Sequence, residues 1–324
     1  MKLSRRTFCK LLLGGGLATA LAAPPASLAY VLLGEPWWLE VTHLDIPVFG
    51  LPPILDGLTI AHLSDFHHSA VVPLEYVRRA VDTANSLDAD LMLLTGDYVT
   101  RSAGYIAPAA AELGRLHAPR GVYATLGNHD HWVDGPAVAA ALSSVGVRVL
   151  RNRSHPITGS DDSVWLVGVD DIWVDADDLP AALADVPPHA PRILLIHNAD
   201  FMERPDVQAQ RFDLVLAGHT HGGQVRLPGL GALVVPSRYG QKYAGGLVSL
   251  PNTPVYVSRG IGLIAPPVRF LCRPEIALIR LVAASRQPAT AMAATLQSLP
   301  GCRRGACGRG SGDRARRAPA TAPG

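Results

Sequence analysis

Eight side chains that can bind metal ions or transfer protons stand at the ends of five short apolar runs. The runs belong to the segments LTIAHLSDFH, DLMLLTGDY, GVYATLGNHD, RILLIHNAD and DLVLAGHTH, and the side chains are Asp65, His67, Asp97, Asn128, His129, His197, His219 and His221. Carboxylate, imidazole and amide groups without a thiolate form a nitrogen and oxygen ligand set. Polar groups seldom stand where buried strands end unless they are paired or bind something. Seven of them, with His129 set aside, suit two metal ions that share a bridging carboxylate.

The apolar runs themselves predict the elements that position these side chains. Each run has about four to seven residues bounded by Gly, Asp or Asn, which is typical of a buried strand. Between them, apolar residues recur at helical spacing from Leu74 to Leu87 after Pro73, and a second helix is expected between a capping Asp134 and Gly146. Strands that alternate with helices predict an α/β fold whose functional groups gather at the carboxyl ends of the strands.

Other polar residues close to these runs have simpler interpretations. His68 and His131 adjoin the motifs and either contact substrate or support the site from outside. His62 lies within a strand and is interpreted as a core histidine, and Asp170 with Asp171 reads as an acidic turn. The segment Gly222-Gly223-Gln224 is expected to let the chain turn close to the metals.

The charge of the chain is unevenly distributed. Among the 324 residues, the N-terminal segment and the tail after residue 284 are basic, whereas residues 31–284 hold 18 basic and 26 acidic residues. That central region carries a net charge of about −8, which argues against a nucleic-acid-binding surface. Bound divalent cations would offset part of this charge. Of the four cysteines, Cys272 is expected to be a buried thiol.

Both ends of the chain are expected to lie outside the folded domain. Residues 1–35 have a basic, then apolar, then small-residue layout, and Ser4-Arg5-Arg6-Thr7-Phe8 with Lys10 looks like a twin-arginine export signal. The twin-arginine translocase is therefore an expected partner, with the protein on the outer side of the cytoplasmic membrane. A basic membrane anchor is the alternative, although Pro24-Pro25 would interrupt a spanning helix. Residues 36–284 would form the domain, and residues 285–324 a disordered tail rich in Arg, Ala, Pro and Gly.

Taken together, the motifs resemble those of the calcineurin-like metallophosphoesterase superfamily. The matching segments occur in the family's order: SDFH (64–67), GDY (96–98), GNHD (127–130), the histidine of LLIHNAD (197) and GHTHGGQ (218–224). The closing stretch 256–281 resembles the exported bacterial branch called YkuE-like. The resemblance covers roughly residues 58–282. Phe66 and His68-Ser69 depart from the usual residues of the first motif but leave the ligand positions intact.

The resemblance implies a fold of two packed mixed β-sheets with helices on the outer faces, and a dinuclear centre. Two divalent ions, Mn, Fe or Zn, would be held in two groups with Asp97 as the bridge. The first group would be Asp65, His67 and His221, and the second Asn128, His197 and His219. His129 would lie over the site without binding metal and act in catalysis, steadied by Asp130.

The implied activity is hydrolysis of a phosphomonoester, phosphodiester or pyrophosphate, with a metal-bound hydroxide as the nucleophile and His129 as general acid. Apolar residues 260–270 and Trp37-Trp38 could meet an acyl chain or a membrane, so a lipid-linked or envelope-linked substrate fits. The alternative is an envelope protein that binds metal without turnover, but Asp97 and His129 are both present. A zinc peptidase is excluded because no H-E-x-x-H motif occurs. We expect a monomer.

Overall fold

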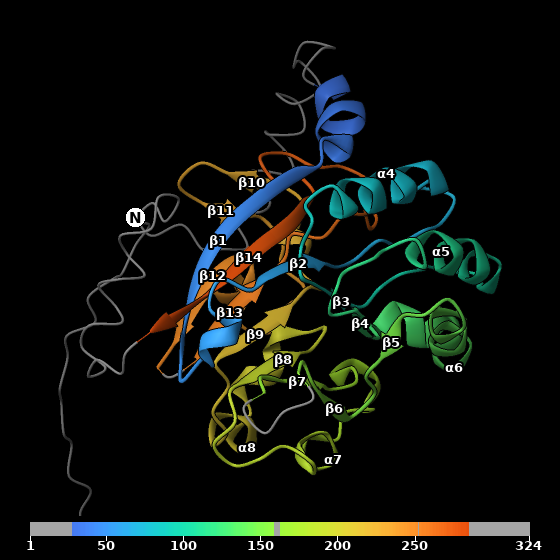
Figure 1. Ribbon diagram of the computed structural model, residues 1–324. Helices are drawn as coiled ribbons and strands as arrows, with labels where there is room; N and C mark the ends of the chain where they lie inside the picture. Colours follow the sequence, from blue (N-terminus) through green and yellow to red (C-terminus); the bar gives the residue numbers. More distant parts are fainter. Residues whose placement is uncertain (1–27, 159–162, 252, 285–324) are drawn as a thin grey trace, which may run out of the picture. The chain divides into compact units, whose positions relative to one another are not determined.

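Two six-stranded β-sheets pack face to face in the computed structural model, which describes residues 28–158, 163–251 and 253–284 (Figure 1). The expectations for the export segment and the tail fall on residues 1–27 and 285–324, outside the described residues. In spatial order, the first sheet contains β1 (Glu40–Phe49), β14 (Glu275–Ala284), β2 (Thr59–Leu63), β3 (Leu91–Thr95), β4 (Val122–Thr125) and β5 (Arg148–Val149). The second contains β12 (Gly246–Leu250), β13 (Thr253–Val257), β9 (Leu214–Ala217), β8 (Arg192–Leu195), β7 (Trp165–Gly168) and β6 (Arg153–Pro156).

Both sheets are mixed, but the strands that lead to the site are parallel. β2, β3 and β4 pair in parallel, as do β7, β8 and β9. The antiparallel pairs are β14 with β2, β12 with β13 and β6 with β7. All residues of β3 and β9 are buried, which explains their continuous apolar sequences. Parallel pairing brings the carboxyl ends of β2, β3 and β4 to one edge and those of β8 and β9 to another, so the predicted fold class is confirmed.

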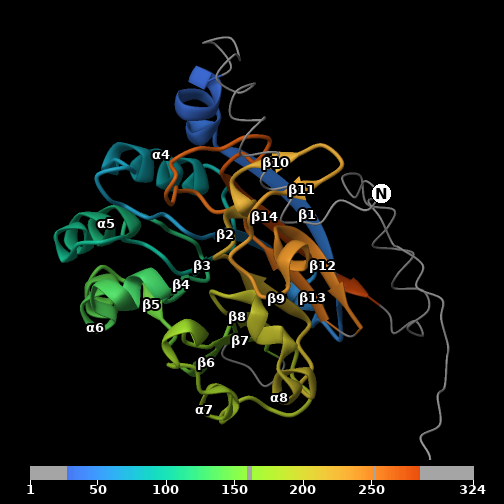
Figure 2. The same cartoon turned by 180° about the vertical axis from the view of Figure 1, so that it is seen from behind.

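Helices cover the outer face of each sheet (Figure 2). Helices α4 (Leu74–Asn85), α5 (Ile106–Leu113) and α6 (Asn128–Ser144) pack on the first sheet, and α7 (Leu179–Leu183) and α8 (Pro205–Gln208) on the second. A third apolar cluster lies between the sheets and joins residues such as Leu93 to Leu195 and Leu216. The remaining helical turns are η2 (Tyr30–Gly34), η3 (Glu35–Trp37), η4 (Pro53–Leu55), η5 (Ala103–Tyr105), η6 (Ile172–Val174), η7 (Ala199–Glu203), η8 (His221–Gly223) and η9 (Gly240–Tyr243). A two-stranded ribbon, β10 (Arg226–Leu227) and β11 (Gly231–Ala232), lies apart from both sheets.

The two predicted helices are present, and one starts earlier than expected. In α6 the residue Asp134 has an extended backbone (φ −178°), and its Oδ1 accepts a hydrogen bond from Ala137 N at 3.0 Å, which is the expected cap. An additional helical turn precedes it, because Asn128 at the end of β4 already begins the helix. Within the described residues, no helix has the length and apolar character needed to cross a membrane.

Candidate metal centre

Loops from both sheets meet at the carboxyl ends of their strands and bring together all seven predicted ligands. Asp65 and His67 follow β2, Asp97 follows β3, and Asn128 begins α6 after β4. The second sheet contributes His197 after β8 and His219 with His221 after β9. Each of the seven residues is at most 5% exposed. Residues so polar are rarely buried together unless they are paired or hold an ion.

One group of possible ligand atoms comes from Asp65, His67 and His221. Each residue offers one atom, and these atoms all lie within 4.8 Å of one another. Nε2 of His221 lies 3.3 Å from Oδ1 of Asp65, and Nε2 of His67 lies 3.8 Å from the same oxygen. The two Nε2 atoms are 2.9 Å apart. Three nitrogen and oxygen ligand atoms that converge in this way can bind one cation.

A second group consists of Asp97, His197 and His219, from the other strand ends. Nε2 of His197 is 3.1 Å from Oδ2 of Asp97, and Nδ1 of His219 is 3.3 Å from Nε2 of His197. Asp97 also faces the first group, because the same Oδ2 lies 3.5 Å from Nε2 of His67. One carboxylate oxygen therefore stands between histidines of both groups.

His129 lies at the edge of this arrangement. Its ring meets that of His67 edge-on, with centroids 4.7 Å apart, and a ring nitrogen lies within 4.8 Å of possible ligand atoms of His67 and Asp97. Its Nδ1 is 3.3 Å from Oγ1 of Thr100, and the same hydroxyl lies 2.7 Å from Nδ1 of His67. Thr100 thus orients both rings, a role that sequence motifs did not indicate because threonine after a strand is common.

Asp130 supports the backbone rather than the His129 ring. Its Oδ2 accepts hydrogen bonds from Asp97 N at 2.7 Å and Gly127 N at 3.0 Å, and its Oδ1 accepts one from Tyr98 N at 2.8 Å. This differs from the expectation that Asp130 steadies His129. The reason is its place on the third residue of α6, from which a carboxylate reaches back to the N-cap, as in a capping box.

The loops hold the ligand positions in left-handed backbone conformations. Asp65, His67, Asp97, His219 and His221 have φ between 50° and 72°. This region costs non-glycine residues on the order of 1–3 kcal/mol each, and such strain collects at functional sites. Gly222 and Gly223 (φ 66° and 77°) and Gln224 (φ 55°) continue the turn, which confirms the expectation for that segment.

Glycine is required where two of these loops touch. A Cβ on Gly127 would lie 2.3 Å from Oδ1 of Asp97, and a Cβ on Gly218 would lie 2.0 Å from Oγ of Ser64 and 2.3 Å from Oδ2 of Asp65. Both distances are far below a van der Waals contact. The glycines of the GNHD and GHTH motifs therefore allow the carboxylates to approach the neighbouring chain.

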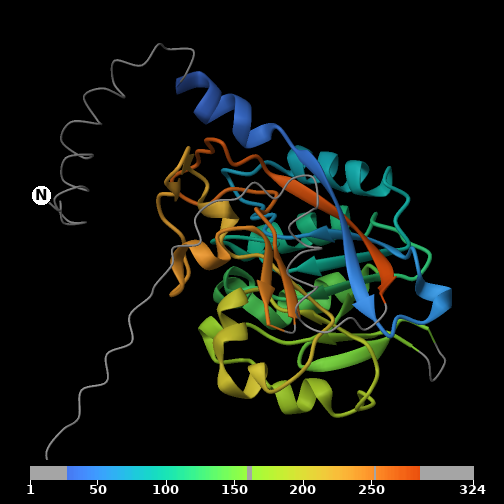
Figure 3. The same cartoon turned by 90° about the vertical axis from the view of Figure 1, so that its left-hand side faces the viewer.

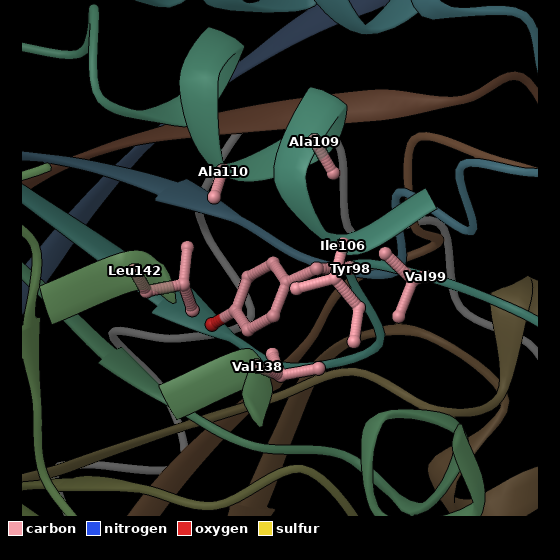
Figure 4. A pocket seen from close by; sticks show the side chains of 7 residues that line it. All are labelled: Tyr98, Val99, Ile106, Ala109, Ala110, Val138 and Leu142. Carbon is pink, nitrogen blue, oxygen red and sulfur yellow. The ribbon is translucent and has the colours of Figure 1, made fainter. Parts of the chain in front are cut away.

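Beneath the site, the loop after β3 is anchored by Tyr98. Its hydroxyl donates to Thr125 O at 2.7 Å, while its ring packs among apolar side chains of α5 and α6 (Figure 4). The small pocket around the ring is otherwise lined by Val99, Ile106, Ala109, Ala110, Val138 and Leu142. These side chains offer no ligand for a metal or a phosphate, so this pocket belongs to the packing and not to the chemistry.

The electrostatics of the cluster follow from burial and from opposite charges in contact. Burial opposes ionisation of Asp97, but the facing imidazoles, first of all His197, outweigh it and lower the pKa of the carboxyl. Asp97 in turn raises the pKa of His197 against the effect of burial. Burial lowers the pKa of His219 to about 3 and that of His129 to about 4. The Asp97 carboxylate is thus ionised and the His219 imidazole neutral, which are the forms that bind cations.

Several buried polar atoms in the cluster lack partners among the described residues. They are Oδ1 and Nδ2 of Asn128, Nε2 of His219 and Nδ1 of His221. By contrast, Nδ1 of His197 contacts Thr95 O at 2.6 Å, which leaves its Nε2 directed at Asp97. Buried polar groups are nearly always satisfied, and a backbone carbonyl on one ring nitrogen is the usual support of a metal-binding histidine. The residues present therefore fit a pair of divalent cations.

The remaining predicted positions have structural roles. His62 is buried with Nε2 2.9 Å from Thr95 Oγ1, which confirms a core histidine, and Cys272 is a buried thiol. Nδ1 of His68 contacts Val72 O at 2.9 Å. Nε2 of His131 lies 2.6 Å from Oδ1 of Asp170.

Asp170 and Asp171 form the acidic turn that the sequence indicated after β7, but this turn is buried. Both carboxylates are at most 1% exposed. Asp170 is paired with His131 and with Arg151, whose Nε lies 2.7 Å away, and Asp171 accepts a hydrogen bond from Trp173 N and so caps η6. Their strand end faces the body of the protein and not solvent.

Two exposed tryptophans adjoin the centre and were not predicted. The Trp173 ring meets His219 edge-on at 4.3 Å between centroids, and the Trp132 ring lies 4.8 Å from that of His129. Trp132 is 58% and Trp173 44% exposed. An isolated tryptophan carries no sequence signal for such a position, because tryptophan is more often a core residue.

Comparison with known proteins places this geometry in a family. Residues 58–223 match the family model described as calcineurin-like phosphoesterase. The chain is 34% identical over 288 residues to the uncharacterized metallophosphoesterase YkuE of Bacillus subtilis, with 86% of this chain and 98% of the relative covered. It is 31% identical to phosphodiesterase YaeI of Escherichia coli, with 86% and 100% covered.

A third relative is UDP-2,3-diacylglucosamine pyrophosphatase LpxG of Chlamydia trachomatis, 28% identical, with 82% of this chain and 95% of the relative covered. The matched residues include every predicted ligand and His129. The chain therefore belongs to the calcineurin-like phosphoesterase family and is a metal-dependent phosphoester hydrolase.

Proposed function

We propose that this protein is an exported phosphodiesterase or pyrophosphatase that uses two divalent ions and acts on a lipid-linked or envelope-linked substrate. The observation that carries the dinuclear assignment is the position of Asp97. Its Oδ2 lies 3.5 Å from His67 Nε2 and 3.1 Å from His197 Nε2, and so between the two groups of ligand atoms. Asp65, His67 and His221 would hold one ion, and Asn128, His197 and His219 the other.

Two such ions, when bound, neutralise charge on a phosphate and lower the pKa of water. The side chains of the protein itself orient the catalytic histidine and supply a proton to the leaving group. Thr100 orients the His129 ring through Nδ1. Because burial lowers the pKa of His129 to about 4, the ring has to take up a proton beside an anionic phosphate before it can donate that proton to the leaving oxygen. Burial of the surrounding residues excludes bulk water, which strengthens each electrostatic contact with the substrate.

The names of two relatives support the reaction class, because one is a phosphodiesterase and another a pyrophosphatase that acts on a diacylated sugar nucleotide. The leaving group of a phosphodiester or of a nucleotide-linked pyrophosphate carries an organic part. Trp132 and Trp173 offer apolar surface for such a group at the edge of the site.

The test is metal analysis of the purified protein combined with a substrate panel. Two divalent ions per chain are expected, with faster hydrolysis of bis(p-nitrophenyl) phosphate and of a nucleoside diphosphate lipid than of p-nitrophenyl phosphate. A single ion per chain would contradict the dinuclear site. A preference for the monoester would contradict the substrate class while leaving the metal assignment intact.

Export is supported by the residues Arg5-Arg6 followed by Phe8. Replacement of Arg5 and Arg6 by lysine is expected to retain the protein in the cytoplasm, as measured by cell fractionation. The same variant in cells that lack the twin-arginine translocase is the control. Unchanged export of the lysine variant would refute this route.

A further inference from the structure

Three segments that are distant in sequence meet at one end of the domain, which we call the apolar end: residues 28–38, 226–239 and 262–273. The third segment joins the other two. Arg269 N donates to Val31 O at 3.2 Å in the first segment, and Arg226 N in the second donates to Phe270 O at 2.9 Å. In Figure 3 the orange-red segment that precedes β14 runs between η2 and the β10–β11 ribbon.

Large apolar side chains project into solvent from each of the three segments. They are Leu33 (73% exposed) and Trp38 (52%) in the first, Leu230 (57%), Leu233 (50%) and Val234 (74%) in the second, and Leu271 (52%) in the third. Single exposed apolar residues are normal on a protein surface, but a gathering of this kind marks an interaction site.

These side chains are held outward by a rigid frame. The buried guanidinium of Arg269 donates to the backbone oxygens of Cys272 at 3.0 Å, Arg259 at 2.8 Å and Gly262 at 2.7 Å, and so ties the third segment together. Leu271 is kept in the left-handed region (φ 51°) with its side chain exposed. That conformation is costly for leucine, so the exposure is built into the fold and is not a result of loose packing.

The charges of the apolar end have one sign at the surface. Arg226 and Arg238 lie in the second segment and Arg273 in the third, and none of the three has a carboxylate ion-pair partner within the described residues. The only acidic residue of the three segments, Glu35, is 1% exposed. Apolar side chains surrounded by basic groups match the interface of a bilayer with anionic headgroups.

We propose that the apolar end binds the surface of an anionic lipid bilayer and inserts Leu33, Leu233, Val234 and Leu271 among the headgroups. A lipid surface fits better than a protein partner because none of the three segments exposes a carboxylate that would repel anionic headgroups. The apolar sequence LLLGGGLATALAA ends four residues before the first segment and adds hydrocarbon close to the same part of the chain. The proposal does not depend on the proposed substrate.

The same segments are connected to the metal centre. Gln224, three residues after His221, donates from Nε2 to Pro266 O at 2.9 Å and accepts from Ile264 N at 2.9 Å through Oε1. Gly262 N donates to Asp65 O at 2.6 Å. A bilayer bound at the apolar end would therefore rest against the loops that carry Asp65 and His221, next to the position of a lipid-linked phosphate.

The test uses the full chain, loaded with metal, and two kinds of vesicle: phosphatidylcholine with phosphatidylglycerol, and phosphatidylcholine alone. Hydrogen exchange is measured with and without vesicles, so that contact by the terminal segments is distinguished from contact by the apolar end. Slower exchange is expected in residues 228–235 and 264–272 with the anionic vesicles, and no change in residues 50–57. Unchanged exchange in both residues 228–235 and residues 264–272 would overturn the proposal.

A pair of variants provides an independent readout. Leu233→Asp combined with Val234→Asp should weaken sedimentation with anionic vesicles by at least about tenfold, because two side chains lose apolar insertion and gain charge. Ile54→Asp is the matched control, since Ile54 is also 74% exposed but lies on η4, away from the three segments. Equal vesicle binding by the double variant and the wild type would count against the apolar end. Both variants should hydrolyse a soluble ester at the wild-type rate, so a failure here is distinct from a failure of the proposed activity.

Discussion

The metal centre and the apolar end depart from ordinary burial in opposite directions. At the centre, two aspartates, an asparagine and four histidines are removed from solvent, whereas at the apolar end leucines and a valine are pushed into it. Both departures cost stability, because desolvating charge and hydrating hydrocarbon are each unfavourable. A fold retains such features at functional sites and compensates elsewhere, here through the apolar clusters on both faces of each sheet.

The two regions also share a device, which is a strained backbone held by a buried polar side chain. Asp130 accepts hydrogen bonds from the backbone N–H groups of the Asp97 loop, and Arg269 donates hydrogen bonds to backbone carbonyls of the loop before β14. In each case one ionisable side chain fixes a loop that contains a residue in the left-handed conformation, Asp97 in the first loop and Leu271 in the second. The difference lies in what is fixed: inward-facing ligands in one loop and outward-facing hydrocarbon in the other.

The largest effect is expected for Asp97→Asn, which removes the charge that the two ligand groups share. Turnover should fall to background, and metal content should fall because an amide is a weaker ligand than a carboxylate. Activity and metal content per folded chain are the measurements. Asp82→Asn makes the same chemical change at an exposed ion pair with Arg115 and should be neutral. Full activity with two metals in the Asp97 variant would show that this residue is not the bridge.

A smaller loss is expected for His129→Ala, since it removes a proton donor and leaves the seven proposed ligands intact. The rate should drop on the order of 10²–10⁴-fold with metal content unchanged. His117→Ala, at an exposed histidine, serves as the control. Loss of one metal ion from the His129 variant would instead identify His129 as a ligand, which its distance to Asp97 and His67 allows.

Removal of metal should lower stability moderately. The ions bind the folded state only, and at a hundredfold excess over Kd each site contributes about 2.7 kcal/mol. For a domain of this size that corresponds to a fall in melting temperature of roughly 5–10 °C per ion after chelation. Differential scanning calorimetry before chelation, after it and after restoration of Mn²⁺ measures the effect. A melting temperature that chelation does not change would mean that the folded state is stable without a cation in the cluster.

The sequence predicted the centre better than it predicted the apolar end. Asp65, Asp97 and His219 were identifiable because polar residues after apolar strands are rare and because parallel strands bring their ends together. Thr100 and Trp173 were missed, since their roles depend on a loop conformation that no spacing encodes. For Asp170 the sequence indicated an acidic turn but not its burial, because a strand end in the second sheet can face the interior of the protein. The role of Leu271 could not be predicted either, because a leucine after an apolar run suggests burial, and only the Arg269 frame turns it outward.

The smallest effect is expected for Val234→Asp, and it sharpens the comparison between the two regions. Val234 is 74% exposed, so the substitution buries no charge and opens no cavity. The free energy of unfolding should change by less than about 0.5 kcal/mol. Val77→Asp makes the same change at a fully buried position of α4 and should prevent folding. Urea denaturation measures both variants. A loss of several kcal/mol at Val234 would show that the apolar end packs against part of this chain in solution, whereas a neutral result means that its apolar surface is retained for a role other than stability.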